Sequence, residues 1–347
     1  MSTPTIPAGN LYMNATLWTG TGNVANTITN GVAGQSFQPD FVWAKARSNT
    51  YDYVLYDSVR GTGTGTNLAS NNTAAEGANS IYANLSSFNS NGFSIGTTSA
   101  TNILNNSGST FVGWQWKAGG AAVSNTSGTI TSQVSANTTS GFSIVSYTAP
   151  ASGAFSVGHG LGAVPSFIIQ KNRTTVTNWF TQHISTGTQY MQLNGTGVAT
   201  TDSTVWNSAP TSSVINVGSG FSGSVAQIIY CWTPIAGYSA FGSYTGNGST
   251  DGPFIYLGFR PRYVLLKRTD STGNWGVWDT SRDPYNAVQY ELVPNASDAE
   301  TTAAGARLDI LSNGFKLRNT GVAYNASSGT YIYACFAENP FKYSNAR

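Results

Sequence analysis

One short phrase occurs three times in the chain, and this repetition limits the folds that the sequence can adopt. Each copy has a proline, a variable residue, an aromatic residue, two apolar residues, a variable residue and a lysine. The copies are PDFVWAK from Pro39, PSFIIQK from Pro165 and PRYVLLK from Pro261. Because proline cannot donate a backbone hydrogen bond, its place before an apolar run fits the start of a β-strand. The phrase therefore predicts the same strand in three places.

The segments around each phrase also recur, in the same order and at similar spacing. An aromatic residue followed by threonine precedes each phrase, and an apolar strand ending in an aromatic residue follows it. The closing aromatic residues are Trp116, Trp232 and Phe336. Regular self-similarity of this kind is the signature of an internal repeat. We therefore predict modules at 10–119, 140–236 and 237–340, a linker or connecting strand at 120–139, and a C-terminal tail at 341–347.

Each module has the size and the composition of a β-sandwich. Units of about 100 residues with short alternating strands and frequent turns are typical of that architecture. In the first copy, Phe41, Trp43 and Lys45 fall on one face of the strand, and Val42 and Ala44 fall on the other. Apolar residues on both faces predict a central strand, with the lysine pointing outward near its exit. We expect an all-β fold of three tandem β-sandwich, jelly-roll-like modules.

One stretch carries a helical signal. Ser297 precedes an alanine- and glutamate-rich run, SDAETTAAGARLDIL, which Gly305 interrupts. A serine N-cap before such a run favours a helix, and an internal glycine weakens it. We therefore expect one or two helical turns there.

The composition argues against several classes of function. Only 9% of the residues are charged and the net charge is +2, so no basic surface for nucleic acid is expected. No apolar run approaches the roughly 18 residues that a membrane-spanning helix needs. The N-terminus lacks the basic start and the apolar core of a signal peptide. We expect synthesis in a cytoplasm, no membrane insertion and no nucleic-acid partner.

The sequence offers no set of residues typical of catalysis or metal binding. Two histidines and two cysteines lie far apart, without the spacing of metal ligands. His159, between two glycines, is interpreted as a turn residue. Cys231 and Cys335 occupy equivalent strand positions in different modules and are expected to be buried free thiols. No nucleophile elbow and no phosphate-binding glycine motif occurs. We therefore expect no catalytic residue, no metal and no cofactor.

A pair of opposite charges recurs in two of the modules. Asp57 precedes Arg60 by three positions and Asp279 precedes Arg282 in the same way, whereas the second module reads TQHIST. A catalytic interpretation would use the aspartates as acid or base. Their recurrence instead favours a structural turn, in which the aspartate accepts backbone N–H groups and pairs with the arginine.

Exposed aromatic residues would be able to stack on sugar rings. Most of the tryptophans lie in apolar strands, where core packing explains them. Trp206 and Trp275 instead lie in the polar, turn-rich stretches VWNSAP and STGNWG. These two are the candidate ligand-binding residues.

Several phrases together resemble a known group of proteins. They include PDFVWAKAR, YDSVRG, FNSNGFSIG, FVGWQWKAGG, VGHGLGAVPSFIIQKNR and the ending YIYACFAENPFKYSNAR. This series resembles repeat-bearing, tail-fibre-like and structural virion proteins of tailed bacteriophages, many of them marine or cyanobacterial. The resemblance runs from about Leu17 to Arg347 and departs mainly in the second module, which lacks the Asp–Arg turn.

The resemblance implies a non-enzymatic virion protein, either a tail fibre or another surface-exposed component involved in host attachment. A capsid decoration or head-fibre protein and a lectin-like glycan-binding module are the alternatives. A polysaccharide depolymerase is disfavoured by the few carboxylates and by the absence of a long β-helix repeat. The implied partners are other virion proteins, further copies of the chain in a homo-oligomer, with a trimer expected, and a host cell-surface glycan. The implied location is the virion, after synthesis in the host cytoplasm.

Overall fold

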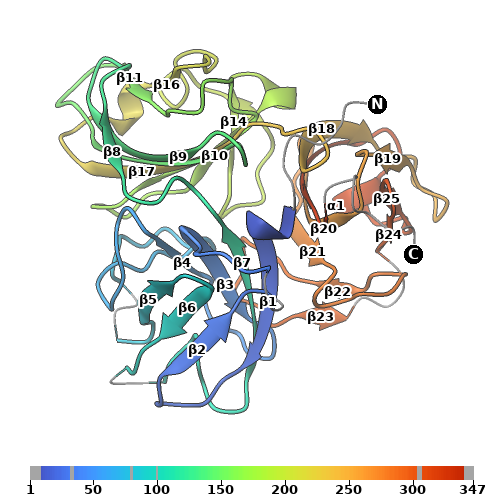
Figure 1. Ribbon diagram of the computed structural model, residues 1–347. Helices are drawn as coiled ribbons and strands as arrows, with labels where there is room; N and C mark the ends of the chain where they lie inside the picture. The colour runs from blue at the N-terminus through green and yellow to red at the C-terminus, as the bar shows by residue number, and fades with distance from the viewer. Residues whose placement is uncertain (1–8, 32–34, 79–80, 99–100, 303–306, 340–347) are drawn as a thin grey trace.

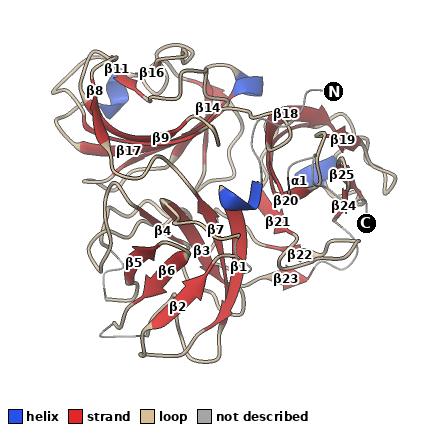
Figure 2. Ribbon diagram, in the orientation of Figure 1, coloured by secondary structure: helices blue, strands red, loops and turns tan. Residues whose placement is uncertain are grey.

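The regular secondary structure of the described residues is almost entirely antiparallel β-strand (Figures 1 and 2). The computed structural model describes residues 9–31, 35–78, 81–98, 101–302 and 307–339. Its strands form several sheets, and its helical segments are single short turns. The predicted all-β fold class is confirmed.

The first copy is a sandwich of two sheets. Its elements are the 3-10 helix η1 (Gly9–Leu11) and strands β1 (Met13–Thr19), β2 (Asn26–Thr29), β3 (Phe41–Ala46), β4 (Val54–Asp57), β5 (Leu85–Asn89), β6 (Gly92–Ile95) and β7 (Thr110–Trp116). The sheets have the orders β1-β7-β3-β4 and β2-β6-β5. Trp18, Phe93 and Phe111 are among the buried residues that fill the space between them. Alternating apolar side chains thus give each sheet a buried face.

The second copy has a wider main sheet. Its elements are β8 (Val123–Asn125), β9 (Ser132–Asn137), β10 (Phe142–Thr148), β11 (Phe155–Gly158), β12 (Phe167–Asn172), β13 (Phe180–His183), η2 (Ile184–Thr186), β14 (Gln189–Gln192), β15 (Thr200–Thr201), β16 (Val214–Val217), η3 (Ser219–Phe221) and β17 (Ala226–Trp232). The main sheet has the order β15-β14-β13-β12-β17-β10-β9-β8, and β11 pairs with β16. The stretch predicted as a linker or connecting strand, 120–139, contains β8 and β9, which extend this sheet from β10.

The third copy contains the one α-helix of the described residues. Its elements are β18 (Ser239–Thr245), β19 (Phe254–Tyr256), β20 (Pro261–Arg268), β21 (Trp275–Asp279), β22 (Tyr290–Glu291), β23 (Thr301–Thr302), β24 (Leu308–Leu311), β25 (Gly314–Leu317), α1 (Val322–Asn325) and β26 (Thr330–Ala337). The sheets have the orders β18-β26-β20-β21, β19-β25-β24 and β22-β23.

The helical turns predicted from Ser297 are absent from the described part of that stretch. Thr301 and Thr302 form β23, and β24 begins at Leu308. The backbone N–H of Glu300 donates to the carbonyl of Arg47 at 2.7 Å, so a contact with the first copy replaces a helical hydrogen bond. Residues 303–306 and the predicted tail, 341–347, lie outside the described residues.

The same order of strand pairing occurs three times. In each copy the first long strand pairs with the closing strand, the closing strand pairs with the strand of the repeated phrase, and that strand pairs with the next one. The phrase strands are β3, β12 and β20. Pro39 and Pro165 lie just before β3 and β12, and Pro261 begins β20. The module boundaries stay a prediction, while the repeated pairing is a property of the fold.

The inner faces of the three main sheets share one apolar core, around which the copies are arranged (Figure 1). The closing aromatic residues of the copies meet there. Ring centroids lie 5.9 Å apart for Trp116 and Trp232, 5.5 Å apart for Trp116 and Phe336, and 6.3 Å apart for Trp232 and Phe336. The three copies are therefore joined by packed aromatic rings as well as by the chain itself.

Candidate functional site

The three lysines of the repeated phrase are buried, and the expectation that they point outward is wrong. Lys45, Lys171 and Lys267 each have 0% of their surface exposed. Burial lowers the pKa of each lysine to about 8, because the ammonium group loses hydration. The strand pattern did not reveal this burial, since parts of the chain remote in sequence contribute to it.

Two of these lysines bind loops of the preceding copy. Lys171 Nζ donates to the carbonyl of Thr73 at 3.0 Å, and Lys267 Nζ donates to the carbonyl of Thr196 at 3.3 Å. Both ammonium groups also donate to carbonyls of their own copy. Lys171 and Lys267 therefore each link two copies through backbone oxygens, whereas Lys45 donates to the carbonyls of Ala46 and Asn49 in its own copy.

Replacing Lys171 by methionine should remove a pH dependence of stability. An unfolded lysine keeps its proton up to about pH 10.4, whereas buried Lys171 has a pKa of about 8. Between these two pH values the unfolded state binds more protons than the folded state. The free energy of unfolding of the wild type should therefore rise with pH, relative to that of the variant. Urea denaturation of both proteins at about pH 7 and about pH 9.5 measures this change. The half-buried Lys117→Met is the control, and a constant difference between wild type and Lys171→Met would contradict the prediction.

The recurring aspartates hold the turns that follow β4 and β21. Asp57 Oδ1 accepts the backbone N–H groups of Val59 at 3.0 Å and Arg60 at 2.8 Å. The side chain of Arg60 contacts the other carboxylate oxygen. In the third copy, Asp279 is bound by Arg282 in the same way, with Nε 2.6 Å from Oδ2. This is the geometry that the sequence predicts for a structural turn.

The buried Asp279–Arg282 pair is charged. Burial alone would raise the pKa of Asp279, but Arg282 and the hydrogen bonds to the carboxylate hold the pKa below its usual range. Both side chains are fully buried. Neither group of this pair is therefore exposed to act on a substrate.

Trp206 and Trp275 do not fit the expectation of ligand contact. Trp206 is 1% exposed and Trp275 is 0% exposed, so neither presents a ring face to solvent. Trp206 Nε1 donates to the carbonyl of Thr181 at 3.4 Å, and Trp275 Nε1 donates to the carbonyl of Gln192 at 2.9 Å. Polar residues beside them in the sequence form turns, whereas the indole rings point into the cores.

The hydrogen bond from the Trp275 indole is one of a set of contacts that recur in the copies and that were not predicted from the sequence. An aromatic residue stands at the same distance after each phrase lysine, and its backbone N–H donates to an asparagine side chain at 2.8–2.9 Å. The aromatic residues are Tyr53, Trp179 and Trp275, and the asparagines are Asn71, Asn194 and Asn295. The indoles of the last two donate to carbonyls of the preceding copy. The constant spacing from the lysine was the signal that could have revealed them.

A glutamate forms ion pairs with both copies at the junction between the first and the second copy. Glu76 binds Arg60 of its own copy at 2.8 Å and Arg173 of the second copy at 2.7 Å. The backbone N–H of Glu76 also donates to the carbonyl of Arg173 at 2.9 Å. The Asp57–Arg60 turn thereby becomes part of a network that joins two copies.

The junction between the third and first copies repeats this network. Glu300 binds Arg282 of its own copy at 3.0 Å and Arg47 of the first copy at 2.7 Å. Its backbone N–H donates to the carbonyl of Arg47. Two of the three junctions are thus closed by the same four side chains, one aspartate, two arginines and one glutamate.

The junction between the second and third copies keeps the backbone contact without these charges. The N–H of Ala199 donates to the carbonyl of Thr269 at 2.9 Å, so Ala199 stands in the place of the glutamate and Thr269 in that of the bridging arginine. Thr186, three residues after the strand end at His183, stands in the place of the other arginine. Smaller, uncharged side chains therefore occupy all three positions.

An open cleft of about 480 Å³ occupies this third junction. It lies where η2 contacts β18. Five lining residues carry hydroxyl groups: Ser185, Thr186, Ser243, Thr269 and Thr330. Gln189 and Asp270 add an amide and a carboxylate, and Val198 and Ile332 add apolar surface. This cleft is the candidate functional site.

His183 fixes the edge of the cleft. Its Nδ1 accepts the backbone N–H of Ser185 at 3.1 Å, so Nε2 carries the proton that faces the carbonyl of Tyr333 at 3.1 Å. Burial lowers the pKa of His183 to about 4, which keeps the ring neutral near pH 7. His183 therefore links the second copy to the third and is not an exposed base.

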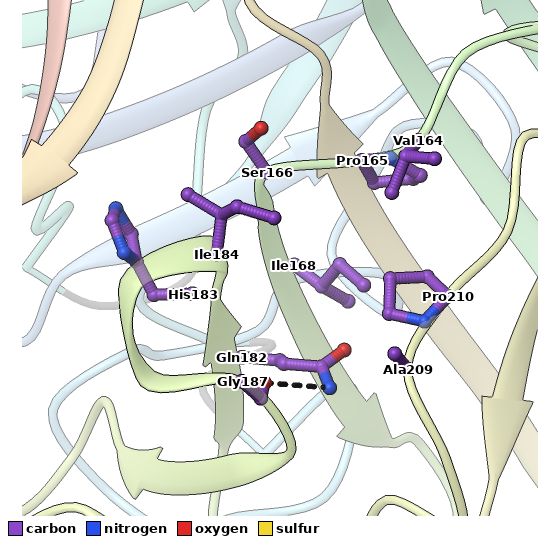
Figure 3. A pocket seen from close by; sticks show the side chains of 10 residues that line it. All are labelled: Val164, Pro165, Ser166, Ile168, Gln182, His183, Ile184, Gly187, Ala209 and Pro210. Carbon is purple, nitrogen blue, oxygen red and sulfur yellow. Dashed lines mark hydrogen bonds between the residues drawn. The ribbon is translucent and has the colours of Figure 1, made fainter.

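A second cavity, of about 60 Å³, lies beside β12 and β13 (Figure 3). Ile168 and Pro210 line it, and Gln182 Nε2 donates to the carbonyl of Gly187 at 3.1 Å. Gln182 Oε1 is buried and has no hydrogen-bond partner within the described residues. This cavity is too small for a sugar ring and suits a water-sized donor.

The remaining polar groups singled out in the sequence are buried. His159 accepts the N–H of Leu161 at Nδ1 and faces the carbonyl of Thr211 at Nε2, in the loop between β11 and β12. Cys231 and Cys335 are buried free cysteines, as predicted. Across the described ranges, no cluster of three or more His, Cys, Asp or Glu is placed to hold a metal ion. None of the helices in those ranges has the length and apolar character needed to cross a membrane.

The comparisons with known proteins gave one match. A family model described as "Domain of unknown function (DUF7483)" matches residues 8–340, so all three copies lie inside one family unit. No curated protein and no solved structure matches the chain.

Proposed function

The chain belongs to the DUF7483 family, and we propose that it is a non-enzymatic structural protein of a bacteriophage virion. In this role it is a tail fibre, a tail-associated protein or another surface-exposed component that takes part in attachment to the host. The resemblance of its repeated phrases to tail-fibre-like proteins supports this role.

The use of the buried charges is the observation that carries the non-enzymatic part of the proposal. The Asp–Arg–Glu–Arg networks and two of the buried lysines, Lys171 and Lys267, join one copy to another. A general acid or base must reach the proton that it transfers, and these groups are enclosed. Their arrangement suits a rigid body that keeps its shape outside the cell.

The surface composition agrees with such a role. Only 9% of the residues are charged. A surface covered mainly by neutral polar groups has few exposed ion pairs for salt to screen. A particle exposed to media of changing ionic strength would benefit from this insensitivity.

Particle labelling tests the proposal directly. Antibodies raised against the purified chain should label the surface of virions produced from the genome that encodes it, and should slow their adsorption to host cells. Size exclusion with light scattering gives the oligomeric state, and a mass near three times 36.5 kDa would support a trimeric fibre. Absence of the chain from purified particles, checked by mass spectrometry, would overturn the proposal.

A lectin-like glycan-binding protein is the second candidate, and the cleft at the third junction favours it. A depolymerase fits that cleft less well. Glycosidases need two carboxyl groups about 5–10 Å apart, whereas the cleft lining contains one carboxylate, Asp270, which binds Arg268 at 2.9 Å. Release of reducing ends from host polysaccharide by the purified chain would argue for the enzyme.

A further inference from the structure

We infer that the cleft between the second and third copies binds a neutral sugar residue. This inference rests on the proposed role in attachment and names the site and the ligand class for it. Three steps support it: the origin of the cleft, the rigidity of its walls and the chemistry of its lining.

The cleft exists because side chains are missing from an otherwise repeated junction. At the other two junctions, two arginines and a glutamate fill the corresponding space. Here Thr186, Ala199 and Thr269 occupy those positions. A buried charge network is absent at this one place, and departures of this kind from a repeated structural solution concentrate at functional sites.

The walls of the cleft are fixed before any ligand arrives. The Ala199 N–H to Thr269 carbonyl bond holds the two copies together across the cleft floor, as its counterparts do at the other junctions. His183 ties the start of η2 to the third copy through the carbonyl of Tyr333. The Thr269 hydroxyl lies 2.8 Å from the Thr330 hydroxyl. Because these groups are already ordered, binding costs little further conformational entropy.

The lining suits a molecule with many hydroxyl groups and no net charge. The serine and threonine hydroxyls and Gln189 can each donate and accept hydrogen bonds. The Asp270 carboxylate is balanced by Arg268, so the site offers no unpaired charge from this pair to an anion or a cation. Val198 and Ile332 provide apolar surface for the C–H face of a sugar ring. The volume of about 480 Å³ lies within the range of small-molecule sites, about 300–1,000 Å³.

Refilling the cleft with the side chains of the other junctions provides the test. The variant A199E/T269R places a glutamate and an arginine where Glu76 and Arg173 meet at the first junction. The probes are methyl glycosides of glucose, galactose and mannose, together with N-acetylglucosamine, each titrated at millimolar concentration and followed by saturation-transfer NMR. We expect at least one probe to bind the wild type and to lose about tenfold or more in affinity in the variant. The control T148R/A151E introduces the same side chains at exposed positions of the second copy and should bind as the wild type does.

A second variant guards against misfolding of the first. Q189A/S243A removes polar groups from the cleft without adding bulk, and it should weaken binding while the circular dichroism spectrum stays unchanged. Equal binding by the wild type and by both cleft variants would overturn the inference and leave the attachment role intact. In that case the open depression that contains Tyr51 and Tyr82 becomes the place to test. Failure of every probe to bind the wild type would also overturn the inference, whereas particle labelling decides the proposed function independently.

Discussion

Replacing Trp116 by alanine should lower the free energy of unfolding by about 3–5 kcal/mol and should weaken all three copies together. The ring of Trp116 contacts Trp232 of the second copy and both Tyr263 and Phe336 of the third, with centroid distances of 5.9, 5.5 and 5.5 Å. Truncation would leave a cavity that no single copy can close, because its walls belong to different sheets. The loss should therefore appear in one cooperative transition.

Guanidinium denaturation followed by far-UV and near-UV circular dichroism measures this effect. The two signals should give the same midpoint in the wild type and in Trp116→Ala. Val176→Ala, at a position that is 72% exposed, is the control and should leave the midpoint nearly unchanged. Two separated transitions, with one of them unaffected by Trp116→Ala, would show that the copies unfold independently and would contradict the prediction.

Asp279→Asn should cost about 3–5 kcal/mol, because it leaves a buried arginine without its main counter-charge. Arg282 Nε lies 2.6 Å from the Asp279 carboxylate, and both side chains are fully buried. Trp114 Nε1 also donates to this carboxylate at 3.0 Å. Arg282 would keep its ion pair with Glu300 at 3.0 Å and its hydrogen bond to the carbonyl of Val277 at 2.8 Å. Loss of one partner is more costly than loss of both, since an unpaired buried charge keeps its full desolvation penalty.

A double variant separates this desolvation penalty from the net contribution of the ion pair to the free energy of unfolding. D279N/R282M removes both charges and should recover a large part of the lost free energy of unfolding. Asp202→Asn changes a half-buried aspartate that accepts a hydrogen bond from the Thr204 hydroxyl, and it serves as the control. The explanation fails if Asp279→Asn destabilises the protein no more than Asp202→Asn does, or if the double variant is less stable than the single one.

The strands of the fold were predictable because they are encoded locally. An aromatic and apolar alternation after a proline predicted β3, β12 and β20, and the closing aromatic residues predicted the strands that end at Trp116 and Trp232. Contacts between copies were not predictable in this way. Lys171 and Lys267 donate to carbonyls that lie far away in the sequence, and no property of the strand itself reveals those partners.

The candidate site was likewise predictable only in part from the sequence. The sequence revealed that the second copy lacks the Asp–Arg turn, which is the outward sign of the altered junction. It did not reveal that Ala199 and Thr269 lie opposite each other, since only the fold brings them together. Trp206 and Trp275 misled for a related reason, because polar neighbours along the chain do not show which way an indole ring points.

The meeting of three similar closing strands gives one chain the geometry of a homotrimer. In a true homotrimer a single gene change alters every interface at once, so a binding site opened at one interface opens at all three. When the three copies are joined in one polypeptide, each interface can change without the other two. Arg60 and Arg282 form ion pairs at two of the interfaces, while the smaller Thr186 lines the cleft at the third. Joining the copies in one polypeptide thus allows a rigid body to be asymmetric at a single chosen place.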